Sequence, residues 1–209
     1  MITEIIKVNP NRPSLNVIKK AAEIINKGGL LALPTDTVYG LACDATNPSA
    51  VAKVFFVKKR PLTQPFSIAV SKSQDIYKYV ENIPDAAKIL AKRFLPGPLT
   101  LIMKKSKLIP DIVTAARDDI GIRIPDCKIT LDLIKALKKP IVIPSANIHN
   151  KLSPTTAKEV LKYLDGKIDL ILDGGKTKYG VESTIVSCVG KEIKIIREGA
   201  ISSEEILSL

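Results

Sequence analysis

Four basic side chains lie where short polar segments interrupt apolar stretches, and they are well suited to bind anions. They are Lys58, Arg60, Arg123 and Arg197. A guanidinium can donate two hydrogen bonds to one phosphate or carboxylate, and each charged hydrogen bond contributes about 1.5 to 3 kcal/mol. Arg123 lies between isoleucines. It therefore either faces solvent or meets a buried anion such as a substrate carboxylate, because an unpaired buried charge is costly. Lys58 and Arg60 have a second interpretation, as the charged end of a helix.

Hydroxyl-bearing residues lie next to predicted strands in further segments. Thr35 and Thr37 follow one apolar run, Ser145 follows another, and Ser183 precedes a third. Ligands of α/β proteins tend to bind beyond strand ends, so these hydroxyls are candidate ligand contacts. The alternative for the threonines is a turn in which a hydroxyl merely closes the strand. A serine hydrolase is disfavoured because G-x-S-x-G is absent and His149 lies only four residues after Ser145.

Motifs of the common nucleotide and metal enzymes are absent from the sequence. The segment 174–177 imitates the end of a P-loop, but the position of the first glycine is occupied by Leu170. There is no G-x-G-x-x-G, no H-E-x-x-H and no acidic metal motif, so we expect no metal held by protein ligands alone. Cys43, Cys127 and Cys188 lack zinc-site spacing, and we expect them to be reduced and mostly buried.

The composition predicts a folded protein with an anionic partner. The chain has 209 residues, of which 45% are hydrophobic and 25% are charged, and its formal net charge is +11. Such a charge favours nucleotides, RNA or acidic membrane surfaces. Aromatic residues make up only 4%, which disfavours a single-strand binder that stacks bases. We expect a cytoplasmic protein with no membrane partner, because the sequence shows neither a cationic leader nor an apolar run of about 18 residues.

Alternating apolar patterns predict the elements that must position these groups. Strands are expected at 30–33, 66–70, 99–103, 120–124, 141–143 and 168–172, and a hairpin at 184–196 with its turn at Gly190-Lys191. Helices are expected at 14–27, from Pro48 onward, over about 74–93, at 129–137 and at 156–164. Gly28 is expected to close the first helix, and Asn47 to cap the second. The fold class is α/β with a mixed sheet, in a single domain over residues 1–209.

Read in order, the motifs resemble those of one family. They are Pro34-Thr35-Asp36-Thr37-Val38-Tyr39-Gly40-Leu41, Lys58-x-Arg60-Pro61 with Pro65, Pro96-Gly97-Pro98-Leu99-Thr100, Arg123-Ile124-Pro125, Pro144-Ser145-Ala146-Asn147, Ser183-Thr184-Ile185 and Arg197-Glu198-Gly199. Over about residues 15–202, the sequence resembles the YrdC-like threonylcarbamoyl-AMP synthases. The resemblance implies a twisted open mixed sheet flanked by helices, with a concave and positively charged face.

The resemblance also implies an activity. Members of this family make L-threonylcarbamoyl-adenylate and pyrophosphate from L-threonine, bicarbonate and ATP. The product serves the N6-threonylcarbamoyladenosine modification at position 37 of tRNA, through a separate transferase complex that would be the downstream partner. Longer relatives carry a second, C-terminal domain, which we do not expect in this chain. The basic surface adds tRNA or double-stranded RNA as a candidate contact.

The resemblance assigns the site residue by residue. The L-threonine positions correspond to Thr35, Thr37, Arg123, the backbone at Ile143 and Ser183. The ATP positions correspond to Lys58, Arg60, Gln64, Asp119, Ser145, Asn147, Ser153 and Arg197, with Lys58 and Arg60 as the catalytic pair. Nucleotidyl transfer is catalysed mostly by positioning and charge neutralisation, so cations and hydroxyls suffice. Mg²⁺ is expected on the phosphates of ATP.

Two other interpretations remain open. A double-stranded RNA or tRNA-binding module without catalysis would use the same charge. It would tolerate substitution of Arg123 or Ser183, and its affinity would fall steeply with salt. A carbamoyl-adenylate-using domain, of the kind found in hydrogenase maturation and antibiotic O-carbamoylation, would share the pocket, but such domains usually belong to much longer chains.

Overall fold

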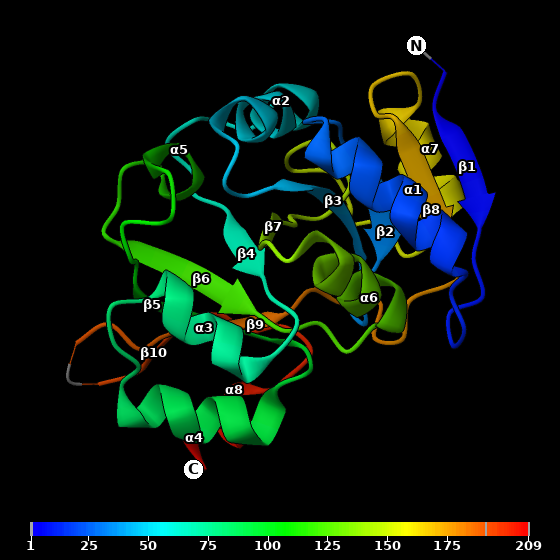
Figure 1. The fold of residues 1–209 in the computed structure, drawn as a ribbon. Coiled ribbons are helices and arrows are strands. Elements are labelled where there is room, and N and C mark those ends of the chain that lie inside the picture. The colour runs from blue at the N-terminus through cyan, green and yellow to red at the C-terminus, as the bar shows by residue number, and fades with distance from the viewer. Residues whose placement is uncertain (1, 191, 209) are drawn as a thin grey trace.

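The computed structural model describes residues 2–190 and 192–208, and its strands form one sheet (Figure 1). The strands are β1 (Glu4–Lys7), β2 (Leu31–Pro34), β3 (Tyr39–Asp44), β4 (Ser67–Ala69), β5 (Leu99–Lys104), β6 (Asp119–Arg123), β7 (Ile141–Val142), β8 (Leu170–Asp173), β9 (Thr184–Ser187) and β10 (Lys194–Arg197). The helices are α1 (Leu15–Asn26), α2 (Pro48–Lys58), α3 (Ser73–Tyr79), α4 (Asp85–Phe94), α5 (Asp111–Thr114), α6 (Lys128–Leu137), α7 (Ala157–Leu164) and α8 (Ser203–Leu207).

The sheet is mixed, as the C-terminal hairpin pattern predicted. Its strand order is β1-β8-β2-β3-β7-β4-β6-β5-β9-β10. Strands β1 and β2 both run parallel to β8, β4 runs parallel to β6, and β5 runs parallel to β9. The remaining neighbours are antiparallel. Because β5 pairs with β9, residues near position 100 come to lie beside residues near position 184.

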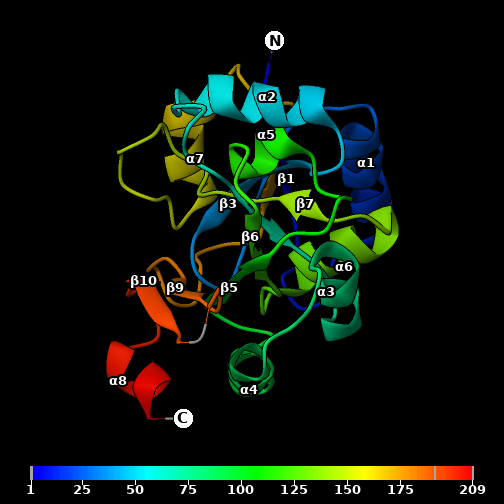
Figure 2. The same cartoon turned by 90° about the vertical axis from the view of Figure 1, so that its left-hand side faces the viewer.

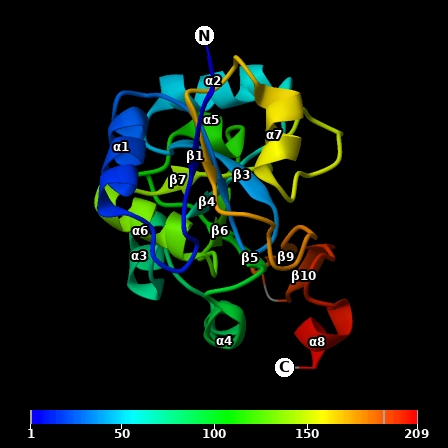
Figure 3. The ribbon, with the colours of Figure 1, turned by 90° about the vertical axis from the view of Figure 1, so that its right-hand side faces the viewer.

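Helices cover both sides of this sheet. Figures 2 and 3 show α1 and α6 together on one side and α7 on the other. Helices α1 and α6 bury Ile18, Ile25 and Leu133 against Leu31 and Leu170 of the sheet. Burying one such side chain contributes about 1.5 to 3 kcal/mol, so this layer fixes one half of the sheet firmly. The larger core cluster joins α2, α4, α5 and α7 to residues from both halves of the sheet, among them Ala32, Leu41 and Ile171 on the strands that α1 and α6 also cover.

The helix ends follow the sequence signals. The side chain of Asn47 accepts a hydrogen bond from the N–H of Ala50 at 3.2 Å, with Pro48 at the first helical position, as predicted. Gly28 has φ 74°, which is the left-handed conformation expected after α1. Both signals are local, which is why the sequence alone reveals them.

Three expectations about elements were wrong or incomplete. The helix expected over 74–93 is two helices, because Pro84, which precedes α4, lacks the N–H that a continuous helix needs. The polar loop expected after Pro34 is short, since the fully buried strand β3 begins already at Tyr39. Strand β1 and the short helices α5 and α8 were not predicted.

The C-terminal hairpin forms with a longer connection than its sequence signal suggests. Strands β9 and β10 pair antiparallel, with Lys194 opposite Ser187 and a register shift between Ile195 and Arg197. The predicted turn at Gly190-Lys191 falls partly outside the described residues, which exclude position 191. The shift lets Arg197 pair with Ile185 at the end of the hairpin that lies near the polar segments.

The cysteines are free thiols, as predicted. Cys43 and Cys188 are buried and Cys127 is half-buried. Burial raises the pKa of Cys188 to about 11, so this thiol stays protonated near neutral pH. In the part of the chain that the structure describes, no helix is long and apolar enough to cross a membrane.

Candidate active site

The turn between β2 and β3 carries the first pair of hydroxyls. The hydroxyl of Thr35 donates to the carbonyl of Val38 at 2.7 Å and accepts from the N–H of Thr37 at 3.1 Å. The hydroxyls of Thr35 and Thr37 are 2.9 Å apart. A threonine hydroxyl thus closes this turn, which confirms the interpretation of the threonines as turn residues. Both threonines also line a pocket, so the two interpretations are compatible.

Arg123, at the end of β6, is buried and joins three parts of the chain. Its Nε donates to the carbonyl of Gly97 at 3.0 Å, and its Nη1 donates to the hydroxyl of Thr37 at 2.8 Å. Its Nη2 forms an ion pair with Asp36. Of the two alternatives for Arg123, solvent or a buried anion, the structure shows a buried anion, and this anion is a carboxylate of the protein itself. Burial lowers the pKa of Arg123, and the nearby Asp36 opposes that shift.

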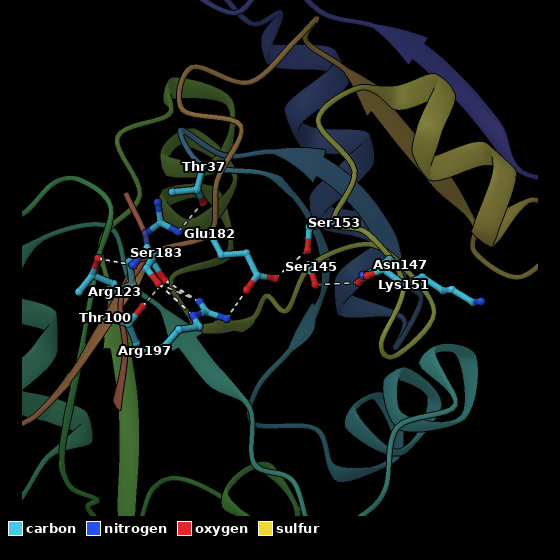
Figure 4. A network of polar contacts seen from close by, with 12 residues as sticks. Thr37, Thr100, Arg123, Ser145, Asn147, Lys151, Ser153, Glu182, Ser183 and Arg197 are labelled. Carbon is cyan, nitrogen blue, oxygen red and sulfur yellow. Dashed lines mark hydrogen bonds and ion pairs between the residues drawn. The ribbon is translucent and has the colours of Figure 1, made fainter. Parts of the chain in front are cut away.

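A second pair of hydroxyls lies where β5 meets β9. The hydroxyls of Thr100 and Ser183 are 2.9 Å apart (Figure 4). The backbone carbonyl of Ser183 accepts from Arg197, at 3.2 Å from Nε and 2.9 Å from Nη2. The parallel pairing of β5 and β9 places the two hydroxyls together, and the hairpin brings Arg197 back onto them.

Glu182 connects Arg197 to the loop that precedes α7. Its Oε1 accepts from the hydroxyl of Ser153 at 2.7 Å, and its Oε2 forms an ion pair with Arg197 (Figure 4). The side chains of Glu182 and Arg197 are 34% and 40% exposed, so water and dissolved anions can reach this pair. A negative side chain therefore lies among cations that the sequence assigned to phosphates.

Lys58, the last residue of α2, is buried and points at the loop that follows β7. Its ammonium donates to the carbonyl of Ser145, to the carbonyl of Asn147 at 2.8 Å and to the Asn147 side-chain oxygen at 2.9 Å. Burial lowers the pKa of Lys58 to about 7, and the positive charge of Arg60 acts in the same direction. Lys58 thus fastens the Ser145–Asn147 loop to the end of α2.

Arg60 lies just past the end of α2 and is half-buried. Its Nε and Nη2 donate to the backbone carbonyls of Gln64 at 3.2 Å and Pro65 at 3.0 Å. Its guanidinium carbon lies 5.0 Å from the centre of the Phe66 ring. Lys59 ends the helix in the left-handed conformation, which turns the chain so that Arg60 leaves the helix axis. Burial lowers the pKa of Arg60, which still remains charged near neutral pH.

These groups surround one pocket of about 180 Å³ over the part of the sheet that runs from β3 to β10. Eight of the site residues predicted from the sequence line this pocket: Thr35, Thr37, Arg60, Arg123, Ile143, Ser145, Ser183 and Arg197. Its charged lining residues are three arginines and Glu182. Cations and hydroxyls around a small volume suit a ligand with several anionic groups.

The other predicted site residues lie outside this lining. Lys58 and Asn147 support Ser145, because the ammonium of Lys58 and the hydroxyl of Ser145 both donate to the side-chain oxygen of Asn147. Ser153 lies beyond Glu182, to which it donates. Gln64 takes part through its backbone carbonyl, which Arg60 contacts. Asp119 begins the strand that Arg123 ends, so their backbones are about 13 Å apart at the usual rise of a strand.

Three polar residues of the site were not predicted from the sequence. Asp36 holds Arg123, Glu182 holds Arg197, and Thr100 contacts Ser183. All three lie inside or beside the motifs quoted above. Their closeness in sequence to predicted site residues was the signal that could have identified them as members of the site. What the sequence could not show was the pairing across strands that makes partners of residues far apart in the chain.

Within residues 2–190 and 192–208, no group of three or more His, Cys, Asp or Glu side chains could hold a metal ion. The pocket lining contains a single carboxylate, that of Glu182. A divalent ion that enters together with a triphosphate fits this arrangement better than a metal held by side chains alone.

Comparison with known proteins agrees with these observations. Residues 23–199 match the Sua5/YciO/YrdC family model, which carries the description "Telomere recombination". The threonylcarbamoyl-AMP synthase of Pyrococcus abyssi is 42% identical over 90% of this chain and 56% of its own length. A putative threonylcarbamoyl-AMP synthase of Methanocaldococcus jannaschii is 44% identical over 92% of this chain and 88% of its own. The chain therefore spans about half the length of the first relative and most of the second.

The solved structure of P. abyssi Sua5 complexed with L-threonine superposes with a TM-score of 0.95 at 41% identity, over 99% of this chain and 60% of that one. A mixed sheet flanked by helices, with arginines and hydroxyls gathered over one part of it, defines an α/β protein with a cationic pocket. The matched residues and the superposition then fix the family. The chain belongs to the Sua5/YciO/YrdC family.

Proposed function

We propose that the chain is a synthase that makes L-threonylcarbamoyl-adenylate and pyrophosphate from L-threonine, bicarbonate and ATP. The observation that carries this proposal is the pocket itself, in which Arg123 with its hydroxyl neighbours faces Arg60 and Arg197. An amino acid and a triphosphate need this combination of an oriented carboxylate partner and separate phosphate partners. Relatives named threonylcarbamoyl-AMP synthase, and the likeness to a structure complexed with L-threonine, support the choice of substrate.

The threonine end of the pocket is formed around Arg123. Its three bonds to Gly97, Thr37 and Asp36 leave one N–H on each Nη atom. Those two donors would hold the carboxylate of the amino acid. Thr37 and Ser183 would orient the rest of it, together with the backbone at Ile143, while Thr35 holds Thr37 in place.

The ATP end of the pocket is formed by Arg60, Ser145 and Arg197. Arg60 and Arg197 would hold the triphosphate and neutralise the charge that grows on the leaving pyrophosphate. In this proposal Lys58 and Asn147 act by fixing Ser145. Gln64, Asp119 and Ser153 remain proposed contacts of the nucleotide outside the pocket lining.

The proposed reaction uses no nucleophilic side chain. The amine of threonine takes up bicarbonate to give a carbamate with loss of water. A carbamate oxygen then bonds to the α-phosphorus, and the bond between that phosphorus and the bridging oxygen of pyrophosphate breaks. The residues supply positioning and positive charge. Mg²⁺, bound through the phosphates of ATP, would add charge neutralisation.

The wider context is part of the same proposal. The product would pass to a separate transferase complex that completes N6-threonylcarbamoyladenosine at position 37 of tRNA. We propose a cytoplasmic location, and direct contact with tRNA or double-stranded RNA through the basic surface. The net charge of +11 supports an RNA contact, since a basic protein attracts polyanions without sequence preference.

The test is pyrophosphate release from ATP with Mg²⁺, measured with and without L-threonine and with and without bicarbonate. We expect release only when both co-substrates are present. Arg60→Ala should then raise KM for ATP, whereas Arg93→Ala, which removes an exposed arginine of α4, should not. If ATP stays intact in all four conditions while the folded protein still binds RNA, the synthase proposal fails and the RNA-binding module replaces it.

A further inference from the structure

A second and larger cavity, of about 500 Å³, lies between α3 and α6. It is found at the opposite ends of β4 and β7 from the active-site pocket. Ser71, after β4, and Pro140, before β7, line the new cavity, whereas Ser67 and Ile143 line the first. The two cavities share no lining residue. Figure 2 shows α3 and α6 on the same side of the sheet. We call this cavity the lysine cleft.

The lysine cleft is strongly basic. Its charged lining residues are Lys72, Lys78, Lys135, Lys138, Lys139 and a single acid, Asp75. Asp75 already accepts from Lys78 at 3.1 Å and from the hydroxyl of Ser71 at 3.2 Å. The only carboxylate of this lining is therefore already paired. Two further lysines pair with acids outside the lining, Lys135 with Asp132 at 3.8 Å and Lys139 with Asp44 at 2.8 Å.

Helix ends explain only part of this cluster. Lys135 and Lys138 lie at the C-terminal end of α6, where the helix dipole favours cations. Lys72 lies across the cavity at the N-terminal end of α3, where the dipole disfavours a cation. Lys72 and Lys138 have no ion-pair partner within the described part of the chain. Like charges gathered in this way repel one another, which costs stability unless an anion enters.

The walls of the lysine cleft are apolar. Val70, Ile134 and Pro140 are buried and the ring of Tyr79 is half-buried. Cavities of about 300 to 1,000 Å³ accept organic ligands, and one phosphate group occupies only a small part of such a volume. Cations on the rim with apolar groups and a phenol ring below match a ligand that has both a phosphate and a flat ring.

We propose that the lysine cleft binds the phosphate group of a nucleotide, either free or within an RNA strand, with the nucleoside against its apolar wall. Lys72 and Lys138 supply the charged contacts from opposite sides. Tyr79 supplies the ring surface. The inference stands independently of the proposed synthase activity, because it uses none of the residues of the active-site pocket.

Nuclear magnetic resonance titration of the full chain with AMP, with a six-nucleotide RNA and with inorganic phosphate tests the proposal residue by residue. We expect the backbone amides of Ser71, Lys72 and Lys139 to shift and saturate with a nucleotide probe. Binding in the active-site pocket would shift Thr37 and Ser183 instead, so the two sites are read separately. Response to AMP identifies a free nucleotide as sufficient, and response to RNA alone identifies the strand as the source of the phosphate.

A pair of double variants provides the control. Lys72→Gln with Lys138→Asn removes both unpaired lysines, and Asn tolerates the left-handed conformation of position 138. Lys19→Gln with Lys158→Gln removes the same charge from exposed positions on α1 and α7. We expect the first variant to weaken nucleotide binding at the cleft at least about tenfold and the second to leave it unchanged. Equal affinities of the two variants would overturn the proposal. So would unmoved cleft amides, or saturation by inorganic phosphate at the same concentration as by the nucleotide.

Discussion

At the scale of single residues, the site consists of charged groups that hold one another in place. Arg123 is fixed by Gly97, Thr37 and Asp36, so its position does not depend on a ligand. A preset guanidinium loses little entropy when a carboxylate binds to it, which is the main advantage of such an arrangement. The sequence left two environments open for Arg123, solvent or a buried anion. It could not predict Asp36 as that anion, because the contact joins β6 to the turn after β2.

Arg123→Lys tests whether the fixed N–H donors of this guanidinium are needed to bind L-threonine. Lysine keeps a positive charge beside Asp36 but cannot donate in three fixed directions. We expect the fold to survive and kcat/KM for L-threonine to fall at least about tenfold, since charged hydrogen bonds are lost. The measurement is pyrophosphate release against threonine concentration, with Arg117→Lys on an exposed loop as the control. An unchanged kcat/KM would remove Arg123 from the threonine site.

Glu182→Gln tests whether the acid competes with the ligand. Glutamine keeps the acceptor for Ser153 but no longer neutralises Arg197. We expect affinity for ATP to rise about two- to fivefold, in keeping with the modest energy of a half-exposed ion pair. Calorimetric titration with ATP measures this. Weaker binding would show instead that Glu182 positions Arg197 for the phosphates.

At the scale of elements, the end of α2 and the loop after β7 act as one unit through Lys58. The sequence placed Lys58 and Arg60 together at a helix end, and this is where they lie. Their side chains nevertheless diverge. Lys58 turns inward to Ser145 and Asn147, while Arg60 reaches the pocket. Spacing along a helix end does not determine such a divergence, because it depends on which loop packs against the helix.

Lys58→Met tests this linkage. Methionine fills the space but leaves the carbonyls of Ser145 and Asn147 without the lysine donor, while the Asn147 side-chain oxygen keeps only its bond from the Ser145 hydroxyl at 2.7 Å. We expect the free energy of unfolding to fall by about 2 to 4 kcal/mol. Denaturant unfolding measures it, with Lys53→Met as the control. Lys53, from the exposed face of the same helix, donates to a single acceptor among the described residues, the carbonyl of Gly28 at 2.8 Å. Equal losses in the two variants would contradict the special role of Lys58.

The elements show what a sequence pattern can and cannot reveal. Caps and glycine ends such as Asn47 and Gly28 were predicted because their signals are local. Strand β3 was not predicted because the apolar run that begins at Tyr39 directly follows the polar residues of the preceding turn, and it also contains a glycine. Strand β1 has an exposed pattern on the sheet edge and gives little signal. The strand order was beyond prediction, because it depends on pairings between distant segments.

At the scale of the whole molecule, buried acidic groups link stability to pH. Burial and the negative charge of Asp173 raise the pKa of Tyr39. Its hydroxyl donates to the carbonyl of Gly175 at 2.7 Å, which ties β3 to the segment after β8. Above pH 10 the unfolded chain loses this proton while the folded chain keeps it, so the unfolded state binds fewer protons. The free energy of unfolding must then fall as pH rises.

Tyr39→Phe isolates this effect, because the other titrating groups are common to both proteins. We expect the original protein to lose stability faster than the variant above pH 10, with a difference in slope of up to about 1.4 kcal/mol per pH unit. Below pH 9 the difference between them should stay constant. Urea unfolding from pH 8 to 11 measures both curves. Parallel curves throughout would show that Tyr39 ionises equally in the two states.

The strand order also sets the moment at which the pocket can exist during synthesis. Thr37 leaves the ribosome early, but Ser183, directly before β9, and Arg197 of β10 are synthesised about 150 residues later. Strand β5 pairs with β9, so that side of the pocket cannot form before β9 has been synthesised. A nascent chain can therefore assemble α1, β2 and β3 early on, yet it lacks a complete site until β9 and β10 have been synthesised.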